Sequence, residues 1–455
     1  MGREYILTID AGTSSLKSAL FDERYSLVAQ DKVEYAYEAD GLSVQIDPNV
    51  IWQAFLQVVR NLRDRGYAKD ITLIVPCVFS PALIAMDRDG TPLFPAIIHW
   101  DRRSVRQARR AIQLVGKEKF LAIAGNIPYP GGISLTSMLW LKEERPEVFR
   151  KASVLGHLNT FLLKKLVGRW LIDPTNASVT GLYETTTGSG WSEELTRELG
   201  IPCEKLPPVV SSLEVAGYVS EEVANLTGLR SGVPVLAGSN DTSAAAVGAG
   251  LLREGQVLNI SGSSEILVIC LERPLPSEQY YLRTHPFPGK WLMYDIVIGG
   301  FALEWFRTQF CRELSEVEFY DSYLRGVLER GDRTRVRCIP YLAGDRTSLV
   351  QKRASFSGLT LDTTREECLA ALVEGIVGRM QRTLRAVSQK VAFEGTMVLT
   401  GGASAALFEY KKRVFHDFEV VRRENCSILG CLELAKRYFR NACGGTGRSL
   451  HYFQD

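Results

Sequence analysis

One stretch of the sequence decides the fold: Ile6-Leu7-Thr8-Ile9-Asp10-Ala11-Gly12-Thr13-Ser14-Ser15-Leu16-Lys17. It is typical of a strand, a tight turn of small polar residues and the start of a second strand. The pattern returns in the second half of the chain as Val257-Leu258-Asn259-Ile260-Ser261-Gly262-Ser263-Ser264. Glycine at each bend lets backbone N–H groups approach an anion closely, and the neighbouring hydroxyls and Lys17 add donors and positive charge. Both stretches therefore predict turns that bind phosphate.

Neither turn is a Walker loop. The sequence holds no GxxxxGK[ST] string, and each turn is expected within a hairpin rather than at the start of a helix. The repeated pattern indicates two related half-molecules that each lend one turn to a shared nucleotide. The alternative is two ordinary hairpins with small turns. Asp10, at the end of an otherwise apolar strand, favours the phosphate interpretation.

Length and charge narrow the class of protein. A chain of 455 residues is too long for one ordinary core and predicts two domains with a cleft between them. The 54 lysines and arginines nearly cancel the 52 aspartates and glutamates, which leaves a formal charge of +2. No overall field would then recruit nucleic acid or an anionic membrane, so we expect a small-molecule partner.

Cysteine usage and hydropathy indicate a cytoplasmic protein. The nine cysteines include no CxxC pair, and only Cys426 and Cys431 lie close together in sequence. We therefore expect neither a zinc site nor a disulfide framework. The apolar residues 71–86 are interrupted by two prolines and a serine, which argues against membrane insertion. The first residues lead into a strand rather than a secretory signal.

The first half of the chain mixes strands and helices. We expect strands over residues 6–9, 18–22, 27–33 and 71–75 and a helix over residues 50–62. This mixture predicts an α/β domain.

A basic helix is expected over residues 101–115. Its arginines alternate with apolar residues, and no aromatic residue accompanies them. The pattern favours the solvated face of an amphipathic helix over a patch that binds nucleic acid.

The middle of the chain carries a boundary and a second candidate for catalysis. Residues 211–235 hold three glycines and a proline without a long periodic run, which divides the chain into predicted domains 1–233 and 234–455. Residues 236–250 then predict the end of a strand and a closely packed helix of small residues. Asp241 stands at their junction. From the residues alone it is either the helix N-cap or a general base that accepts one proton.

Several motifs follow one another in a recognisable order: Asp10 to Ser15, residues 87–95, Trp100-Asp101-Arg102-Arg103, Leu139-Trp140-Leu141-Lys142, Gly238 to Gly250, Gly262-Ser263-Ser264, Gly299-Gly300, Pro340-Tyr341-Leu342, Gly344-Asp345-Arg346 and Gly401-Gly402-Ala403-Ser404. Together they resemble the FGGY carbohydrate kinases, relatives of actin and hexokinase, with the xylulose, gluconate and glycerol kinase branches most similar. The resemblance covers nearly the whole chain. It implies an α/β fold of two actin-like, ribonuclease H-like domains with a nucleotide and sugar cleft between them. It also implies ATP-dependent phosphorylation of a hydroxyl on a small sugar, polyol or sugar acid.

The resemblance further implies roles at the matching positions. Asp10 would help to hold Mg²⁺, and the nucleotide phosphates would be cradled by Gly12, Thr13, Ser14, Ser15 and Lys17. The second turn would use Gly262 and Ser263, and the adenosine site would be lined by Gly300, Gly402 and Ala403. Asp241 would take the proton from the acceptor hydroxyl. The acceptor pocket would also hold Ser80, Trp100, Asp101, Arg103 and Thr242.

The departures from the family pattern cluster where the sugar should bind. Val78-Phe79-Ser80-Pro81-Ala82 stands where family members commonly carry polar residues, and Ser137 stands where a lysine is typical. A site that loses hydrogen-bonding groups rejects its original ligand, so the acceptor stays open. Two other hypotheses remain: a non-catalytic regulator on the same fold, which the intact Asp10 and Asp241 oppose, and an actin-like chaperone ATPase, which would need a separate peptide-binding domain. A homodimer is one option for assembly.

Overall fold

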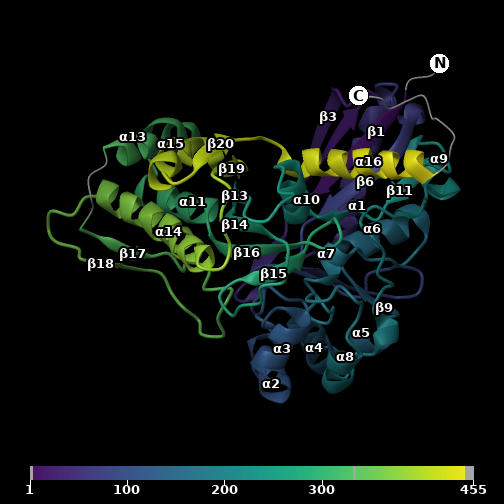
Figure 1. Ribbon diagram of the computed structural model, residues 1–455, viewed down its shortest axis with the longest axis horizontal. Coiled ribbons are helices and arrows are strands. Elements are labelled where there is room, and N and C mark those ends of the chain that lie inside the picture. The colour runs from purple at the N-terminus through teal and green to yellow at the C-terminus, as the bar shows by residue number, and fades with distance from the viewer. Residues whose placement is uncertain (1–3, 331–334, 446–455) are drawn as a thin grey trace.

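The computed structural model describes residues 4–330 and 335–445, which form two lobes, each built on one large sheet (Figure 1). The N-terminal sheet has the strand order β10-β11-β6-β1-β2-β3, with β12 also paired to β6. Its strands are β1 (Tyr5–Ala11), β2 (Ser15–Phe21), β3 (Leu27–Glu34), β6 (Ile71–Val78), β10 (Val215–Tyr218), β11 (Pro234–Leu236) and β12 (Ser239–Asn240).

The C-terminal sheet has the order β15-β16-β14-β13-β19-β20. Its strands are β13 (Val257–Ser261), β14 (Ser264–Leu271), β15 (Tyr281–Thr284), β16 (Trp291–Ile298), β19 (Thr396–Thr400) and β20 (Glu419–Arg422). Two smaller sheets complete the pairing. One has the order β4-β5-β8-β7-β9 and the other is the pair β17-β18, with bounds β4 (Glu38–Asp40), β5 (Ser43–Ile46), β7 (Ala82–Met86), β8 (Ala96–Ile98), β9 (Val154–Gly156), β17 (Arg337–Ile339) and β18 (Ser355–Ser357).

The two large sheets share one topology, which confirms the internal repeat predicted from the sequence. In the first, β1 pairs antiparallel with β2, β2 antiparallel with β3, and β1 parallel with β6. In the second, β13 pairs antiparallel with β14, β14 antiparallel with β16, and β13 parallel with β19. Each predicted phosphate turn lies in the first hairpin of its sheet. The two turns therefore occupy equivalent places in the two halves.

Helices cover both faces of the N-terminal sheet. One face packs on α1 (Pro48–Asp64) and α6 (Leu158–Val167), and the other packs on α10 (Asp241–Gly248) and α16 (Cys426–Gly445). The last helix of the chain thus returns to the first sheet, beside β1 and β6 (Figure 1). The other helices of the N-terminal half are α2 (Val105–Val115), α3 (Lys117–Ala124), α4 (Leu135–Glu144), α5 (Pro146–Lys151), α7 (Pro174–Ala177), α8 (Glu193–Leu199) and α9 (Glu221–Thr227).

The C-terminal sheet is packed mainly by α11 (Gly300–Phe310), α14 (Arg365–Ser388) and α15 (Ser404–Val414). Two short helices of this half are α12 (Glu316–Glu318) and α13 (Leu324–Glu329). Single turns of other helix types occur at Ala68–Asp70, Cys203–Lys205 and Phe319–Tyr323. Phe306 lies in the core of this half, and Trp305 packs against it.

The strands and the first helix predicted from the sequence are confirmed, whereas the basic helix begins later than predicted. Helix α2 starts at Val105, because the residues before it are held by β5 and its neighbouring loop. The Asp101 carboxylate accepts a hydrogen bond from Val44 N at 2.7 Å, and Arg102 N donates to Leu42 O at 2.8 Å. These bonds fix residues 101–104 outside the helix.

Strand pairing crosses the domain boundary predicted at residue 233. Both β11 and β12 pair with β6 of the N-terminal sheet, although they follow that boundary in sequence. The division into residues 1–233 and 234–455 stays a prediction.

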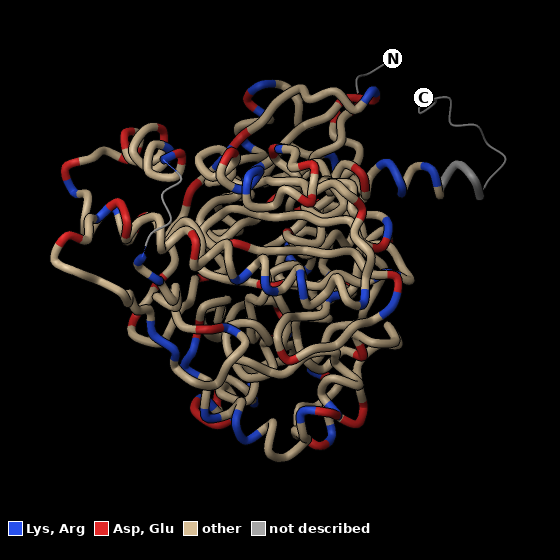
Figure 2. The backbone as a smooth tube through the Cα atoms, turned by 60° about the vertical axis from the view of Figure 1, so that its left-hand side comes forward, with Lys and Arg blue, Asp and Glu red and all other residues tan. Residues whose placement is uncertain are grey.

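Charge is spread over the surface rather than gathered on one face. Figure 2 shows basic and acidic positions interspersed along the backbone, as the near balance of the composition leads us to expect. Among the described helices, none combines the length and apolar character needed to span a membrane.

The approach of α10 to α16 depends on two glycines. A Cβ on Gly248 would lie 2.0 Å from Cys426 O, and a Cβ on Gly430 would lie 1.9 Å from Ala244 O. The predicted close packing of the small-residue helix is therefore confirmed, and α16 is its partner. This contact joins the end of the chain to the segment that follows the N-terminal sheet.

We expect Gly430→Ala to lower the free energy of unfolding by about 1–3 kcal/mol, because the added methyl group forces two helix backbones apart. Gly326→Ala is the matched control, since Gly326 also lies in a helix and a Cβ there meets nothing within 4 Å. The control should leave stability unchanged or raise it slightly. Urea unfolding of both variants checks this, and equal stability of the two would contradict the packing argument.

Candidate active site

Backbone hydrogen bonds close both predicted phosphate turns. In the first, Gly12 N donates to Ser15 O at 3.0 Å. Tyr35, which directly follows β3, donates its backbone N–H to Ser14 O at 3.0 Å. In the second, Gly262 N donates to Ser264 O at 3.0 Å. Since each turn is short and closed on itself, its remaining donors face outward.

The two turns face one cleft of about 430 Å³ between the sheets. Most of the residues predicted to bind nucleotide line it: Asp10, Gly12, Thr13, Ser14, Ser15, Lys17, Gly262, Ser263 and Gly402. Gly300 and Ala403 lie directly behind the second turn, where Gly300 N donates to Gly262 O at 2.8 Å and Ala403 N donates to Ser261 O at 2.9 Å. The structure thus brings the whole predicted nucleotide set together.

Asp10 is a nearly buried carboxylate at the end of β1. Ser427, on α16, donates to its Oδ2 at 2.6 Å, and Lys17 lies opposite it in the β1–β2 register. Burial raises the pKa of Asp10, and the bond from Ser427 and the charge of Lys17 oppose that rise. Ser427 was not found from the sequence, because nothing in a helical stretch far from the turn marks it as a partner of Asp10.

Asp10 suits a magnesium ion that is held mainly by a nucleotide. Mg²⁺ commonly takes one or two protein carboxylates together with substrate phosphates and water. No cluster of three or more His, Cys, Asp or Glu side chains that could hold a metal is found within the described ranges. Asp10 therefore fits a magnesium ion whose other ligands come from nucleotide phosphates and water, rather than a metal cage made by the protein alone.

Asp241 is the first residue of α10, and the helix cap is its neighbour. The Asn240 side chain accepts from Ser243 N at 3.1 Å, so the capping role belongs to Asn240. The Asp241 carboxylate accepts from Thr242 N at 2.6 Å and from Thr242 Oγ1 at 3.2 Å. Burial, aided by the charge of Asp10, raises the pKa of Asp241 to about 7, although the Thr242 bonds oppose it. A carboxyl with this pKa exchanges its proton near neutral pH.

A second cavity of about 180 Å³ continues from the cleft. Thr13, Asp241, Thr242, Gly262 and Ser263 line both spaces. The rest of its wall is largely apolar or aromatic and includes Phe79, Pro81, Val179, Ile260, Ile266 and Ile296. Asp241 therefore stands at the junction of a polar cleft and a smaller pocket.

Some of the predicted acceptor residues line this cavity, whereas others lie behind its wall. Ser80 and Trp100 line the cavity. Asp101 and Arg103 instead form an ion pair at 2.7 Å, in which Asp101 is 1% exposed, and Arg103 Nη2 donates to Gln45 Oε1 at 2.9 Å. The structure places this pair beside β5, where it supports the strand next to Trp100.

Several polar residues of the cavity wall carried no predicted role there, among them His99, Arg283, Tyr294 and Arg346. His99 Nε2 lies 3.3 Å from Thr13 Oγ1, so it links the pocket to the first phosphate turn. Burial and the charge of Arg346 hold the pKa of His99 well below its ordinary value, which keeps the imidazole neutral. The sequence contains the His99-Trp100 pair but no signal that it would face the turn.

Trp100 adopts a backbone conformation that side chains rarely occupy, with φ at +79°. Its ring lies 4.2 Å from His99 and 5.0 Å from Phe301, measured between ring centroids. Strained residues of this kind persist where surrounding packing fixes them, often at functional sites. The tryptophan forms a rigid wall between the acceptor cavity and a neighbouring pocket.

A buried ion pair holds the second turn. Lys411 of α15 is completely buried, and its Nζ donates to Glu265 Oε2 at 2.7 Å and to Asn259 Oδ1 at 2.7 Å. Asn259 and Glu265 lie on β13 and β14, on either side of the turn. Because α15 begins immediately after Gly402 and Ala403, Lys411 connects the two predicted parts of the nucleotide site.

Comparisons with known proteins agree with this geometry. The FGGY family of carbohydrate kinases, N-terminal domain, matches residues 5–248. The chain is 26% identical over 427 residues to gluconokinase of Bacillus subtilis, covering 91% of this chain and 83% of that protein. It is 25% identical to xylulose kinase of Staphylococcus xylosus, covering 88% and 83%. It is also similar to the structure of ligand-bound xylulose kinase from Lactobacillus acidophilus, with a TM-score of 0.86, 22% identity and coverage of 96% and 90%.

These similarities define the class of protein to which the chain belongs. The fold is the two-domain, actin-like α/β fold of the carbohydrate kinases, as the resemblance in the sequence implied. Since the family model matches more than half of its length, the chain belongs to the FGGY family of carbohydrate kinases. It is therefore a kinase, and the family implies ATP as its phosphoryl donor.

We expect Lys411→Met to cost about 3–5 kcal/mol of stability, because it leaves the Glu265 charge buried without a partner. Replacing both residues, with Lys411→Met and Glu265→Leu, should recover most of that loss. Urea unfolding measures the stabilities, and nucleotide titration shows whether the second turn has shifted.

Lys32→Met is the matched control, since Lys32 pairs with Glu34 on the exposed surface of β3. Its removal should change stability little, because exposed ion pairs are screened by solvent. A Lys411→Met variant as stable as this control would show that the buried pair does not hold the turn.

Proposed function

We propose that the protein transfers the γ-phosphoryl group of ATP to a hydroxyl of a small sugar, polyol or sugar acid, with Asp241 as the general base. The observation that carries this proposal is the position of Asp241, which lines both the phosphate cleft and the smaller pocket beside it. An acceptor in the pocket can present a hydroxyl to Asp241 and to the phosphate at once. Phosphoryl transfer requires mainly this in-line placement, neutralisation of charge and removal of one proton.

The raised pKa of Asp241 supports its role as base. A carboxyl with a pKa of about 7 is a stronger base than an ordinary aspartate and is still largely ionised at slightly alkaline pH. The Thr242 N–H and hydroxyl orient its Oδ1, which leaves Oδ2 free for the acceptor. Asn240, as helix cap, keeps Asp241 at the start of α10.

The cleft supplies the charge neutralisation. Outward donors of both turns and the Lys17 ammonium face the space where the phosphates would lie, and Asp10 would hold Mg²⁺ against them. A bound Mg²⁺ would neutralise the phosphate oxygens as negative charge shifts toward the leaving group. Gly300, Gly402 and Ala403, whose small size keeps the backbone close, would receive the adenosine.

The pocket would exclude water from the reaction. Water is itself an acceptor for the phosphoryl group, so a kinase needs an enclosed acceptor site. Phe79, Pro81 and Trp100 supply apolar walls, whereas Ser80 offers a hydroxyl. We further propose a cytoplasmic location, where ATP and sugars meet, and a homodimer stays one option for assembly.

We expect Asp241→Asn to bind ATP normally but to lower kcat by roughly 10²- to 10⁴-fold, the usual contribution of a positioned base. In the unaltered enzyme, kcat/KM should rise with pH up to about 7 and then level, because only the ionised carboxylate accepts a proton. Acceptor-dependent ADP release from Mg·ATP measures both. Unchanged turnover in the variant would remove Asp241 from the mechanism, and nucleotide binding without acceptor-dependent turnover in the unaltered protein would favour a regulator.

Asp241→Asn should also raise the melting temperature more at pH 8 than at pH 5. The folded-state pKa lies above the unfolded one, so the folded protein binds the extra proton and loses stability as pH rises toward 7. Removing the charge relieves that cost. Asp64→Asn is the control, since Asp64 pairs with Arg63 at the surface and should show no such trend. A lower melting temperature at both pH values would indicate a purely structural aspartate.

A further inference from the structure

We propose that the acceptor carries an anionic group, a carboxylate or a phosphate ester, and that Arg346 binds it in the cavity beside Asp241. This inference rests on the proposed kinase function and narrows its substrate class. It comes from the wall of the cavity, where two arginines face the space and neither forms an ion pair with a carboxylate of the described residues.

Arg346 lies at the inner wall of the cavity with donors to spare. It lines both the acceptor cavity and the pocket beyond Trp100, and its guanidinium carbon lies 5.4 Å from the centroid of the Trp100 ring. Its Nη2 atom is buried and has no hydrogen-bond partner in the part of the chain that the structure describes. A buried guanidinium donor without a partner is costly, so a ligand that supplies an acceptor there gains affinity.

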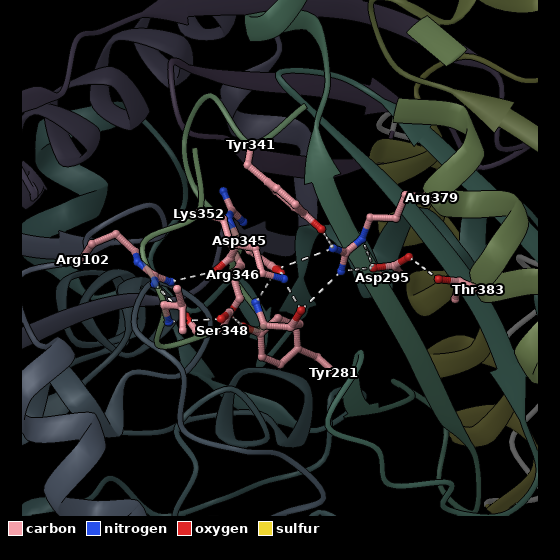
Figure 3. A network of polar contacts seen from close by, with 12 residues as sticks. Arg102, Tyr281, Asp295, Tyr341, Asp345, Arg346, Ser348, Lys352, Arg379 and Thr383 are labelled. Atoms are coloured by element: carbon pink, nitrogen blue, oxygen red, sulfur yellow. Dashed lines mark hydrogen bonds and ion pairs between the residues drawn. The ribbon is translucent and has the colours of Figure 1, made fainter. Parts of the chain in front are cut away.

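The carboxylate of Asp345, next to Arg346 in sequence, is already bonded to other side chains. Asp345 accepts from Lys352 Nζ at 2.6 Å and from Thr347 Oγ1 at 2.9 Å, and Arg379 lies 3.5 Å away. Figure 3 shows Asp345 and Arg346 between Arg102 on one side and Arg379 on the other, with Arg379 also bound to Asp295. The network anchors the segment that carries Arg346 and directs the Asp345 charge to other cations.

Unlike Arg379, the arginines Arg283 and Arg102 bind backbone oxygens rather than carboxylates. Arg283, 3% exposed, donates to Gly132 O at 3.0 Å and to Ser178 O at 3.3 Å. Arg102 donates to Asp345 O at 3.1 Å and to Ser348 O at 2.7 Å. Carbonyl oxygens satisfy hydrogen bonds but cancel no net charge. The acceptor cavity therefore keeps an excess of positive charge.

Asp241 alone does not balance these cations. Burial lowers the pKa values of Arg346 and Arg283 to about 10, which leaves both guanidinium groups charged at neutral pH. The cavity thus faces two cations and the one carboxylate that serves as base. An anionic acceptor would supply the missing charge, and the planar guanidinium fork suits a carboxylate or phosphate in two parallel bonds. A neutral polyol would leave that charge uncompensated.

The test measures acceptor binding and turnover separately. Isothermal titration of the full chain compares D-gluconate with D-glucitol, and D-glucose 6-phosphate with D-glucose; ADP release from Mg·ATP is then followed with each. We expect one acid of the panel to bind more tightly than its neutral counterpart, and its affinity to fall with added salt. The two pairs distinguish a carboxylate from a phosphate ester.

Arg346→Gln should weaken binding of the preferred acid by roughly 10- to 150-fold, the contribution of a charge-assisted hydrogen bond, and leave the KM for ATP unchanged. Arg346→Lys, which keeps the charge but not the fork, should retain part of the affinity. Arg106→Gln, at an exposed arginine of α2 that pairs with Glu144, is the control and should have no effect.

The outcomes separate this inference from the proposed function. Acid binding that depends on Arg346 but gives no turnover would support the anion site and contradict the kinase mechanism. Turnover on neutral acceptors, with no preference for acids and no effect of Arg346→Gln, would overturn the anion site and keep the kinase. Neither binding nor turnover with any of these compounds would overturn both.

Discussion

Two carboxylates that face one cleft constrain the whole site. Asp10 and Asp241 come from strand β1 and helix α10, and the charge of Asp10 adds to the burial that raises the pKa of Asp241. The fold holds them there at a cost in stability, because buried like charges repel. Protonation of Asp241 relieves this repulsion, and a cation held at Asp10, such as the Mg²⁺ proposed above, would do so as well. A ligand that brings a cation to these two carboxylates would therefore stabilise the folded protein.

The doubled sheet explains why the two carboxylates can meet at all. Equivalent hairpins in the two sheets place one turn on each side of the cleft, and α10 enters between them from the end of β12. The glycines at the α10–α16 contact let the helices approach at backbone distance. Behind the second turn, Lys411 ties α15 to β13 and β14 through a buried ion pair. Each support is far in sequence from the group that it positions.

Much of the fold and the nucleotide site could be predicted, because both depend on local pattern. The hairpins around Gly12 and Gly262 carry their turn chemistry in adjacent residues. The acceptor pocket could not be predicted in the same way. His99, Arg283 and Arg346 reach it from three separate segments, and no spacing relates them. Ser427 likewise reaches Asp10 from a distant helix. The start of α2 was placed too early, since Asp101 resembles a helix start but is held by β5 instead. The roles of the named residues remain predictions.

The return of the last helix to the first sheet affects how the chain can fold during synthesis. Helix α16 covers the face of the N-terminal sheet that includes Ile6, Phe21 and Leu73, yet it follows every other described element in sequence. Until it emerges from the ribosome, that face is covered only in part, by α10. The N-terminal lobe cannot finish folding by itself, although N-terminal domains usually fold first. A nascent chain paused before α16 would therefore expose a broad apolar surface.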